Sequence, residues 1–61
     1  MSPNAKIYFD LWVELDDLWK VGKGEDQEAD DLRDRMDAPW RACSAEELEE
    51  VEAAIRAKEA S

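Results

Sequence analysis

The sequence predicts one all-α domain over residues 1–61, a small three-helix up-down bundle with a proline-induced bend between the second and third helices. Apolar residues recur at the spacing of helix faces, and nothing alternates with the period of two that strands show. The two glycines, Gly22 and Gly24, and the two prolines, Pro3 and Pro39, divide the chain into three segments. Short connections between such segments favour antiparallel neighbours.

The first helix is predicted over residues 4–21. Ser2 can cap it with Pro3 in the first turn, and Asn4 is the alternative cap. Its apolar stripe is wide and has an aromatic edge, which is typical of a helix that faces a core. The stripe consists of Ile7, Leu11, Leu15 and Leu18, with Tyr8, Trp12 and Trp19 at its edge. We expect Trp19 and Tyr8 to pack in the core.

Two apolar residues of this segment do not fit the stripe. Phe9 and Val13 fall among charged residues, on the side that should face water. Together with Trp12 they form a candidate interaction surface, for a second copy or for another protein.

The second helix is predicted over residues 27–37, with Asp26 as a plausible cap and Ala29, Leu32 and Met36 on one face. Pro39 should end it, because the proline ring clashes with the carbonyl four residues earlier and disfavours helical dihedrals in the preceding residue. We expect the chain to turn near Asp37 and to aim Trp40 inward, where its indole would close the open end of the helix pair. The alternative is a continuous helix kinked at Pro39.

The third helix is predicted over residues 44–59. Ser44 followed by Glu47 is a capping box, a strong signal for a helix start. Leu48, Val51 and Ile55 form a narrow apolar stripe, so this helix should be the least firmly held of the three.

Composition limits the function. The chain carries 17 acidic against 8 basic residues, a formal charge of −9, and this surface disfavours direct binding of nucleic acid or of anionic membranes. No apolar run is long enough for a membrane span, and the start does not look like a secretion signal, so the expected compartment is the cytoplasm. Five aromatic residues and many aliphatic ones argue against a disordered acidic tail.

Motifs that carry chemistry are missing from the sequence. There is no histidine, and Cys43 has only Arg41 as a nearby base, so we interpret it as a small apolar residue. The segment "DDLWKVGKGEDQ" places apolar residues where a calcium loop needs ligands, and "GKG" lacks the spacing of a phosphate loop. Three short helices also leave little room for a pocket of about 300 Å³. We therefore expect no catalytic residue, no metal site and no cofactor.

The segment "LWVELDDLWKVGKGEDQEADDLRDRMDAPWRACSAEE" resembles small acidic helical proteins of bacteria, of the planctomycete kind. These carry a pattern like LWxExDxLW followed by EADxLRxxMDxPW, and the likeness covers about residues 11–47. Cys43 stands where that pattern has leucine, which supports a packing role. The resemblance implies a bacterial origin and a recurring bend at Pro39 and Trp40. It adds no catalytic residue.

These observations favour a non-catalytic acidic module that binds a protein partner with a basic surface. The alternative is a nucleic-acid mimic, whose carboxylates imitate phosphates and occupy a basic DNA- or RNA-binding protein. An enzyme that works through paired acids is the least favoured class. A weak homodimer through Phe9, Trp12 and Val13 would enlarge a core that 61 residues make small.

Overall fold

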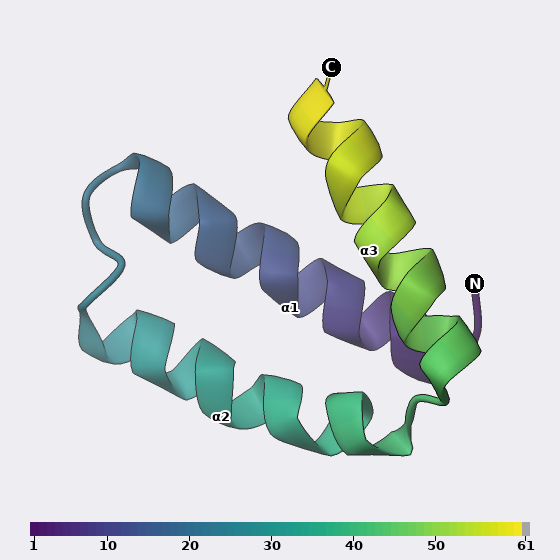
Figure 1. Cartoon of the computed structure of the whole chain (residues 1–61). Helices are drawn as coiled ribbons and strands as arrows, with labels where there is room; N and C mark the ends of the chain where they lie inside the picture. Colours follow the sequence, from purple (N-terminus) through teal and green to yellow (C-terminus); the bar gives the residue numbers. More distant parts are fainter. Residues whose placement is uncertain (61) are drawn as a thin grey trace.

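The computed structural model describes residues 1–60, and over that range it contains three helices and no strand. They are α1 (Pro3–Lys20), α2 (Gln27–Ala42) and α3 (Ala45–Ala60), in that order along the chain (Figure 1). The all-helical prediction with three helices is confirmed. The starts of all three helices lie within one residue of the predicted positions.

Helix α1 begins as the Ser2 cap predicts. The Ser2 hydroxyl accepts a hydrogen bond from the backbone N–H of Ala5 at 3.2 Å, and the Ser2 carbonyl accepts one from Lys6 at 2.9 Å. Pro3 occupies the first turn, where a backbone N–H has no acceptor within the helix, so proline costs no hydrogen bond there. The helix ends before Gly22, whose φ of +79° is the left-handed conformation that glycine adopts at least cost.

The loop between α1 and α2 is held by Trp19. Gly24 is buried, and a Cβ atom built on it would lie 2.5 Å from Cδ2 of the Trp19 indole. The Arg33 guanidinium donates a hydrogen bond to the Gly24 carbonyl at 2.9 Å, so the loop is also tied to α2. One face of Trp19 therefore packs on the loop, although 56% of its side chain stays exposed and the prediction that it lies in the core is wrong.

Helix α2 runs through Pro39, so the prediction that it stops near Asp37 and turns there is wrong. Pro39 stands in the last turn, where it removes one helical hydrogen bond, to the Arg35 carbonyl, and leaves only three residues to follow. The chain leaves the helix later, at Cys43, which has an extended ψ of 140° and donates its N–H to the Trp40 carbonyl at 3.2 Å. The bend that the resemblance places at Pro39 and Trp40 therefore comes after Ala42.

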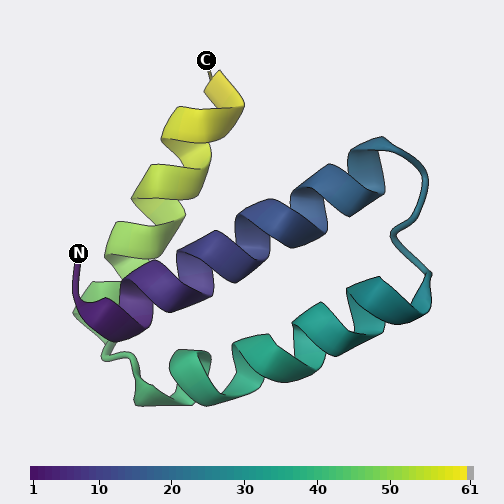
Figure 2. The same ribbon diagram turned by 180° about the vertical axis from the view of Figure 1, so that it is seen from behind.

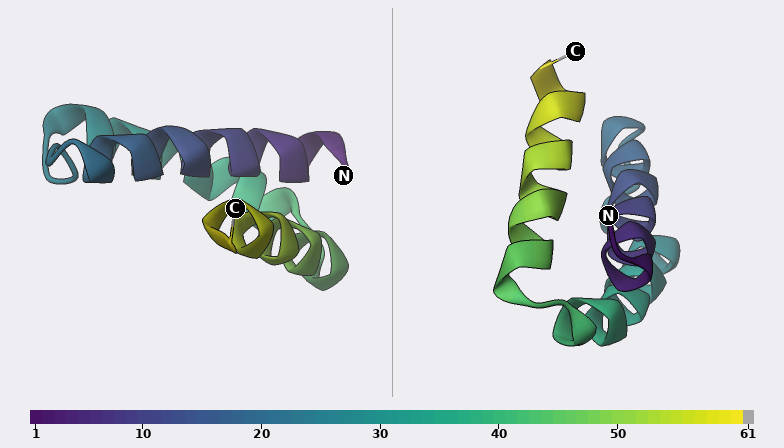
Figure 3. Two further views of the ribbon diagram at one scale, coloured as in Figure 1. Left: turned by 90° about the horizontal axis from the view of Figure 1, so that it is seen from above. Right: turned by 90° about the vertical axis from the view of Figure 1, so that its right-hand side faces the viewer.

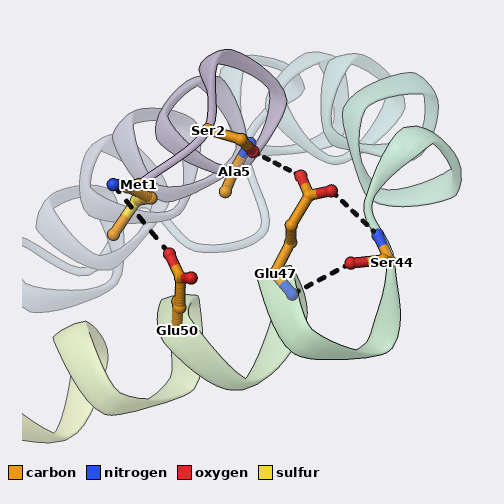
Figure 4. Close-up of polar contacts among 6 residues, drawn as sticks. All are labelled: Met1, Ser2, Ala5, Ser44, Glu47 and Glu50. Carbon is orange, nitrogen blue, oxygen red and sulfur yellow. Dashed lines mark hydrogen bonds and ion pairs between the residues drawn. The ribbon is translucent and has the colours of Figure 1, made fainter.

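Helix α3 begins with the predicted capping box. The Ser44 hydroxyl accepts a hydrogen bond from the Glu47 N–H at 3.2 Å, and Oε1 of Glu47 accepts one from the Ser44 N–H at 3.5 Å. The other carboxylate oxygen, Oε2, accepts a hydrogen bond from the Ser2 hydroxyl (Figure 4). One glutamate therefore links the first turns of α1 and α3.

The helices do not pack pairwise around a common centre. Helix α1 contacts both α2 and α3, whereas α2 and α3 barely touch. Seen from behind, α1 and α2 form an antiparallel hairpin, and α3 diverges from the start of α1 (Figure 2). Helices α1 and α3 run in the same general direction, because Ser2 meets Glu47 at one end and Asp16 lies 3.6 Å from the Lys58 ammonium further along.

The molecule is therefore thin. Its Cα atoms span 31 × 28 × 14 Å, and the side and top views show α3 lying beside the hairpin rather than closing over it (Figure 3). The radius of gyration, 11.6 Å, exceeds the value of about 10.5 Å expected for a compact chain of this length. Within residues 1–60 the buried apolar side chains are Ala5, Ala29, Leu32, Met36 and Val51.

Trp40 is the second tryptophan whose predicted burial is wrong. It is 49% exposed, because α2 continues past Pro39 and carries the indole along its surface instead of turning it inward. The thin fold leaves Ile7 and Val21 exposed as well. Within the described part of the chain, no helix combines the length and the apolarity that a membrane crossing requires.

Candidate interaction surfaces

Two grooves follow the line where α1 and α2 meet, and they differ in chemistry. The acidic groove, of about 370 Å³, is lined by Glu14, Asp17, Leu18, Glu28, Asp31, Leu32 and Arg35. The aromatic groove, of about 260 Å³, is lined by Tyr8, Leu15, Arg33, Met36, Asp37 and Trp40. The acidic groove is larger than the sequence led us to expect, but both grooves are bordered by exposed side chains and open to solvent.

The two grooves lie on opposite sides of the hairpin. At 3.6 residues per turn, Tyr8 and Leu15 point to nearly the same side of α1, roughly 100° or more from Glu14 and Asp17, and they lie nearer to the direction of Ala5 than those acids do. Asp16 contacts Lys58 of α3, so the aromatic groove shares its side with α3. The acidic groove occupies the side that α3 leaves open.

The acidic groove carries a net negative charge. The chain pairs many of its bases with acids one turn away, as in Lys20–Asp16 at 3.0 Å and Arg41–Asp37 at 3.2 Å. Among residues 1–60 no ion pair involves the four carboxylates that line the groove, and Arg35 is the one base beside them. The groove therefore carries a formal charge of −3 over a floor formed by Leu18 and the buried Leu32.

This arrangement suits a ligand that is both basic and apolar. The carboxylates accept hydrogen bonds from lysine or arginine heads, while the leucine floor accepts the aliphatic stems of those side chains. No group of three or more histidine, cysteine, aspartate or glutamate side chains among residues 1–60 is arranged to hold a metal ion. The carboxylates are thus spread along the groove rather than gathered at a point.

The predicted interaction surface of Phe9, Trp12 and Val13 lies on a part of α1 that is half-buried. Phe9 falls on the α1 side that also carries Ala5 and Asp16, which face α3, so α3 covers part of this surface. Val51 is the buried residue of α3, and α3 makes its contacts with α1. As a contact for another molecule, this surface stays a prediction.

Cys43 is half-buried and has no disulfide partner. Burial raises the pKa of its thiol, and the nearby Glu47 carboxylate raises it further. The thiol therefore stays protonated at neutral pH, the form that is a poor nucleophile. A packing role at the junction of α2 and α3 agrees with this setting.

Neither groove was predicted from the sequence. The groove residues were assigned to separate features, namely acids at helix starts and an apolar stripe. The predicted antiparallel hairpin is the signal that could have indicated that these residues lie close together. Pairing α1 with α2 through a short loop brings Glu14 and Asp17 opposite Glu28 and Asp31. No protein-family model matches the chain, and the comparisons with curated proteins and with solved structures gave no match.

Proposed function

We propose that the protein is a non-catalytic interaction module whose acidic groove binds a basic, amphipathic segment of a partner protein. The observation that supports this most directly is the unneutralised set of Glu14, Asp17, Glu28 and Asp31 over two leucines. Five acids elsewhere on the surface are offset by bases one helical turn away. Attraction to a basic partner is strongest where acids lack such neighbours.

The geometry also favours a segment over a whole face. A groove of about 370 Å³ between two helices has the size of a few side chains, and its length follows the hairpin. A helix or extended stretch that presents lysine or arginine beside leucine would place apolar atoms on Leu18 and Leu32 and cations on the rims. We place the partner in the same bacterial compartment, the cytoplasm.

A reversal of charge in the groove tests the proposal. The variant Glu14→Lys/Asp31→Lys changes two groove acids, and the control Glu49→Lys/Glu52→Lys makes the same change of charge on α3, outside both grooves. Titration with a synthetic lysine–leucine amphipathic peptide, followed by tryptophan fluorescence, should give binding to the wild type and the control. The groove variant should bind at least about tenfold more weakly, the effect of losing roughly 1.4 kcal/mol.

Affinity capture from a bacterial extract extends the test to natural partners. The wild type and the α3 control should retain the same basic proteins, and added salt should release them. Equal retention by the groove variant would contradict the proposal. Retention confined to DNA- or RNA-binding proteins, with release by competing nucleic acid, would instead support the mimic, in which the carboxylates replace phosphates.

A further inference from the structure

The aromatic groove presents the largest apolar side chain of α2 to solvent. Trp40 lies at the edge of this groove and is 49% exposed. The buried Met36 forms part of the groove floor. Tyr8 and Leu15 of α1 line the other wall and are half-buried. An indole left half in water beside a groove of about 260 Å³ is the kind of residue that dominates protein–protein contacts.

The rim of this groove is electrically balanced. Arg33 and Asp37 border it, and each pairs with a residue of opposite sign on α2: Arg33 with Asp30 at 3.0 Å and Asp37 with Arg41 at 3.2 Å. In a chain with a formal charge of −9, these two arginines and two aspartates sum to zero. This face is therefore one where a second acidic molecule can approach without strong repulsion.

We propose that the aromatic groove is the contact between two copies of this chain, related by a twofold axis with their α2 helices antiparallel. Arg33 and Asp37 stand one turn apart on α2. An antiparallel second α2 therefore places Arg33 of each copy opposite Asp37 of the other. In this register Trp40 of each copy lies opposite Asp30 of the other, one helical turn from its Arg33. This pairing places the proposed contact on a surface different from Phe9, Trp12 and Val13.

Charge favours a second copy over a basic or an acidic partner at this face. A basic partner would find the acidic groove on the opposite side far more attractive, whereas a second copy presents the same balanced pair of Arg33 and Asp37 and so meets each with the opposite charge. A twofold dimer through the aromatic groove keeps the two acidic grooves on its outer sides. Repulsion between them is then weak at physiological ionic strength, where the screening length is about 8 Å.

The thin fold supports the same occupant. Its Cα atoms span only 14 Å in one direction, and a second copy would bury apolar atoms at the aromatic groove. The thin fold gains most from such burial, because few apolar side chains are buried within one chain. The dimer is accordingly weak, with dissociation in the micromolar range or above.

Sedimentation equilibrium of the full chain at several concentrations and at moderate salt tests the proposal. The wild type should move from 7.0 kDa towards twice that mass as its concentration rises. Trp40→Ala should raise the dissociation constant at least about tenfold, whereas Val21→Ala, at an apolar residue that is more exposed but lies outside the groove, should leave it unchanged. Circular dichroism checks that both variants remain helical.

Exchanging the charges of Arg33 and Asp37 tests the orientation of the two copies. Arg33→Asp alone and Asp37→Arg alone bring like charges together across the axis, so each variant should dimerise more weakly than the wild type. An equal mixture of the two should recover a heterodimer, because each contact then joins an aspartate to an arginine. Such recovery cannot come from repair of a folding defect within one chain. Asp34→Arg, on the outer side of α2, is the control for net charge.

A single 7.0 kDa species up to high micromolar concentration would overturn the proposal. A dimer that Trp40→Ala leaves intact would overturn it equally, since the contact would then lie elsewhere. These outcomes do not depend on the acidic groove, because its test variants Glu14→Lys and Asp31→Lys lie on the other side of the hairpin.

Discussion

The hydroxyl of Ser2 donates a hydrogen bond to the carboxylate of Glu47, 45 residues away in sequence, and this bond joins the starts of α1 and α3 (Figure 4). Ser2 caps α1, and Glu47 completes the capping box of α3 with Ser44. The amino group of Met1 lies 3.9 Å from Glu50 beside this junction. Capping, which is usually a local matter, here contributes to the docking of α3 on α1.

We expect the caps of Ser2 and Ser44 to be energetically coupled through Glu47. Ser2→Ala and Ser44→Ala should each lower the free energy of unfolding by about 1 kcal/mol, the usual cost of losing a cap. Their combined effect should differ from the sum, because both serines bond to Glu47: Ser2 through its hydroxyl to the carboxylate, and Ser44 through its N–H to the carboxylate and its hydroxyl to the Glu47 N–H. Urea denaturation of the single and double variants measures the coupling. Asn4→Ala, at an exposed position in the same first turn, is the control and should be close to neutral.

The hydrogen bonds to Glu47 also predict a pH dependence. The Ser2 hydroxyl, and with it the Ser44 cap, holds the pKa of the Glu47 carboxyl below its ordinary value of 4.5. A lowered folded-state pKa contributes stability above pH 4.5 and loses it as the pH falls through the folded-state pKa. Glu47→Gln should therefore be less stable than the wild type at pH 7, and the difference should shrink below about pH 4.5. A difference in melting temperature that stays constant down to pH 2.5 would contradict this assignment.

The loop at Gly24 should tolerate no side chain while Trp19 is present. Gly24→Ala places a methyl group 2.5 Å from the indole, so the loop or the indole must move and stability should fall. In a Trp19→Ala background the same change should cost much less. Gly22→Ala is a useful comparison: no atom lies within 4 Å, and its cost of about 1 kcal/mol comes from the φ of +79°. That cost should therefore be the same in both backgrounds, as chemical denaturation of the four variants would show.

Replacing Pro39 tests whether the chain is helical at this position or forms a turn. Because α2 continues through Pro39, Pro39→Ala restores an N–H that can bond the Arg35 carbonyl and should stabilise the protein by roughly 1 kcal/mol. If the proline instead began a turn, its loss would destabilise. The thermal midpoint and the helical signal in circular dichroism give the sign, and both should rise.

Salt should raise the stability of the monomer. The chain carries 17 acids, and the four groove carboxylates have only Arg35 as a base among the groove residues, so screening relieves repulsion in the folded state. The exposed pairs within helices oppose this, but each contributes only about 0.2–0.5 kcal/mol. Melting curves at low protein concentration should move to higher temperature between 10 mM and about 300 mM sodium chloride. A downward shift would mean that the ion pairs outweigh the general repulsion.

Local chemistry made the helix starts predictable. Ser2 with Pro3, and Ser44 with Glu47, satisfy free backbone donors within a few residues, so the sequence suffices to locate them. The error at Pro39 has the opposite cause. The rule that proline ends a helix holds for helix interiors, whereas in a last turn the loss is a single hydrogen bond and neighbouring residues can keep the helix.

Burial was less predictable than helicity. The angular position of a residue tells which side of a helix it occupies, but how much of that side is covered depends on where the other helices lie. Trp19 and Trp40 remain about half exposed because α3 does not close over the hairpin. Phe9, assigned to the wet side, is half-buried because α3 packs on that side of α1. Helix order alone does not decide between these arrangements.

The thinness of the fold, with Cα atoms confined to 14 Å in one direction, has a consequence for its evolution. A chain with almost no interior has few positions where a substitution meets packed neighbours, and exposed positions usually tolerate change within about 0.5 kcal/mol. Homologues can therefore diverge over most of their length and still adopt this fold. We expect them to retain the residues that define the helix starts and the loop, such as Ser44, Glu47 and the Trp19–Gly24 pair, while their apolar positions drift.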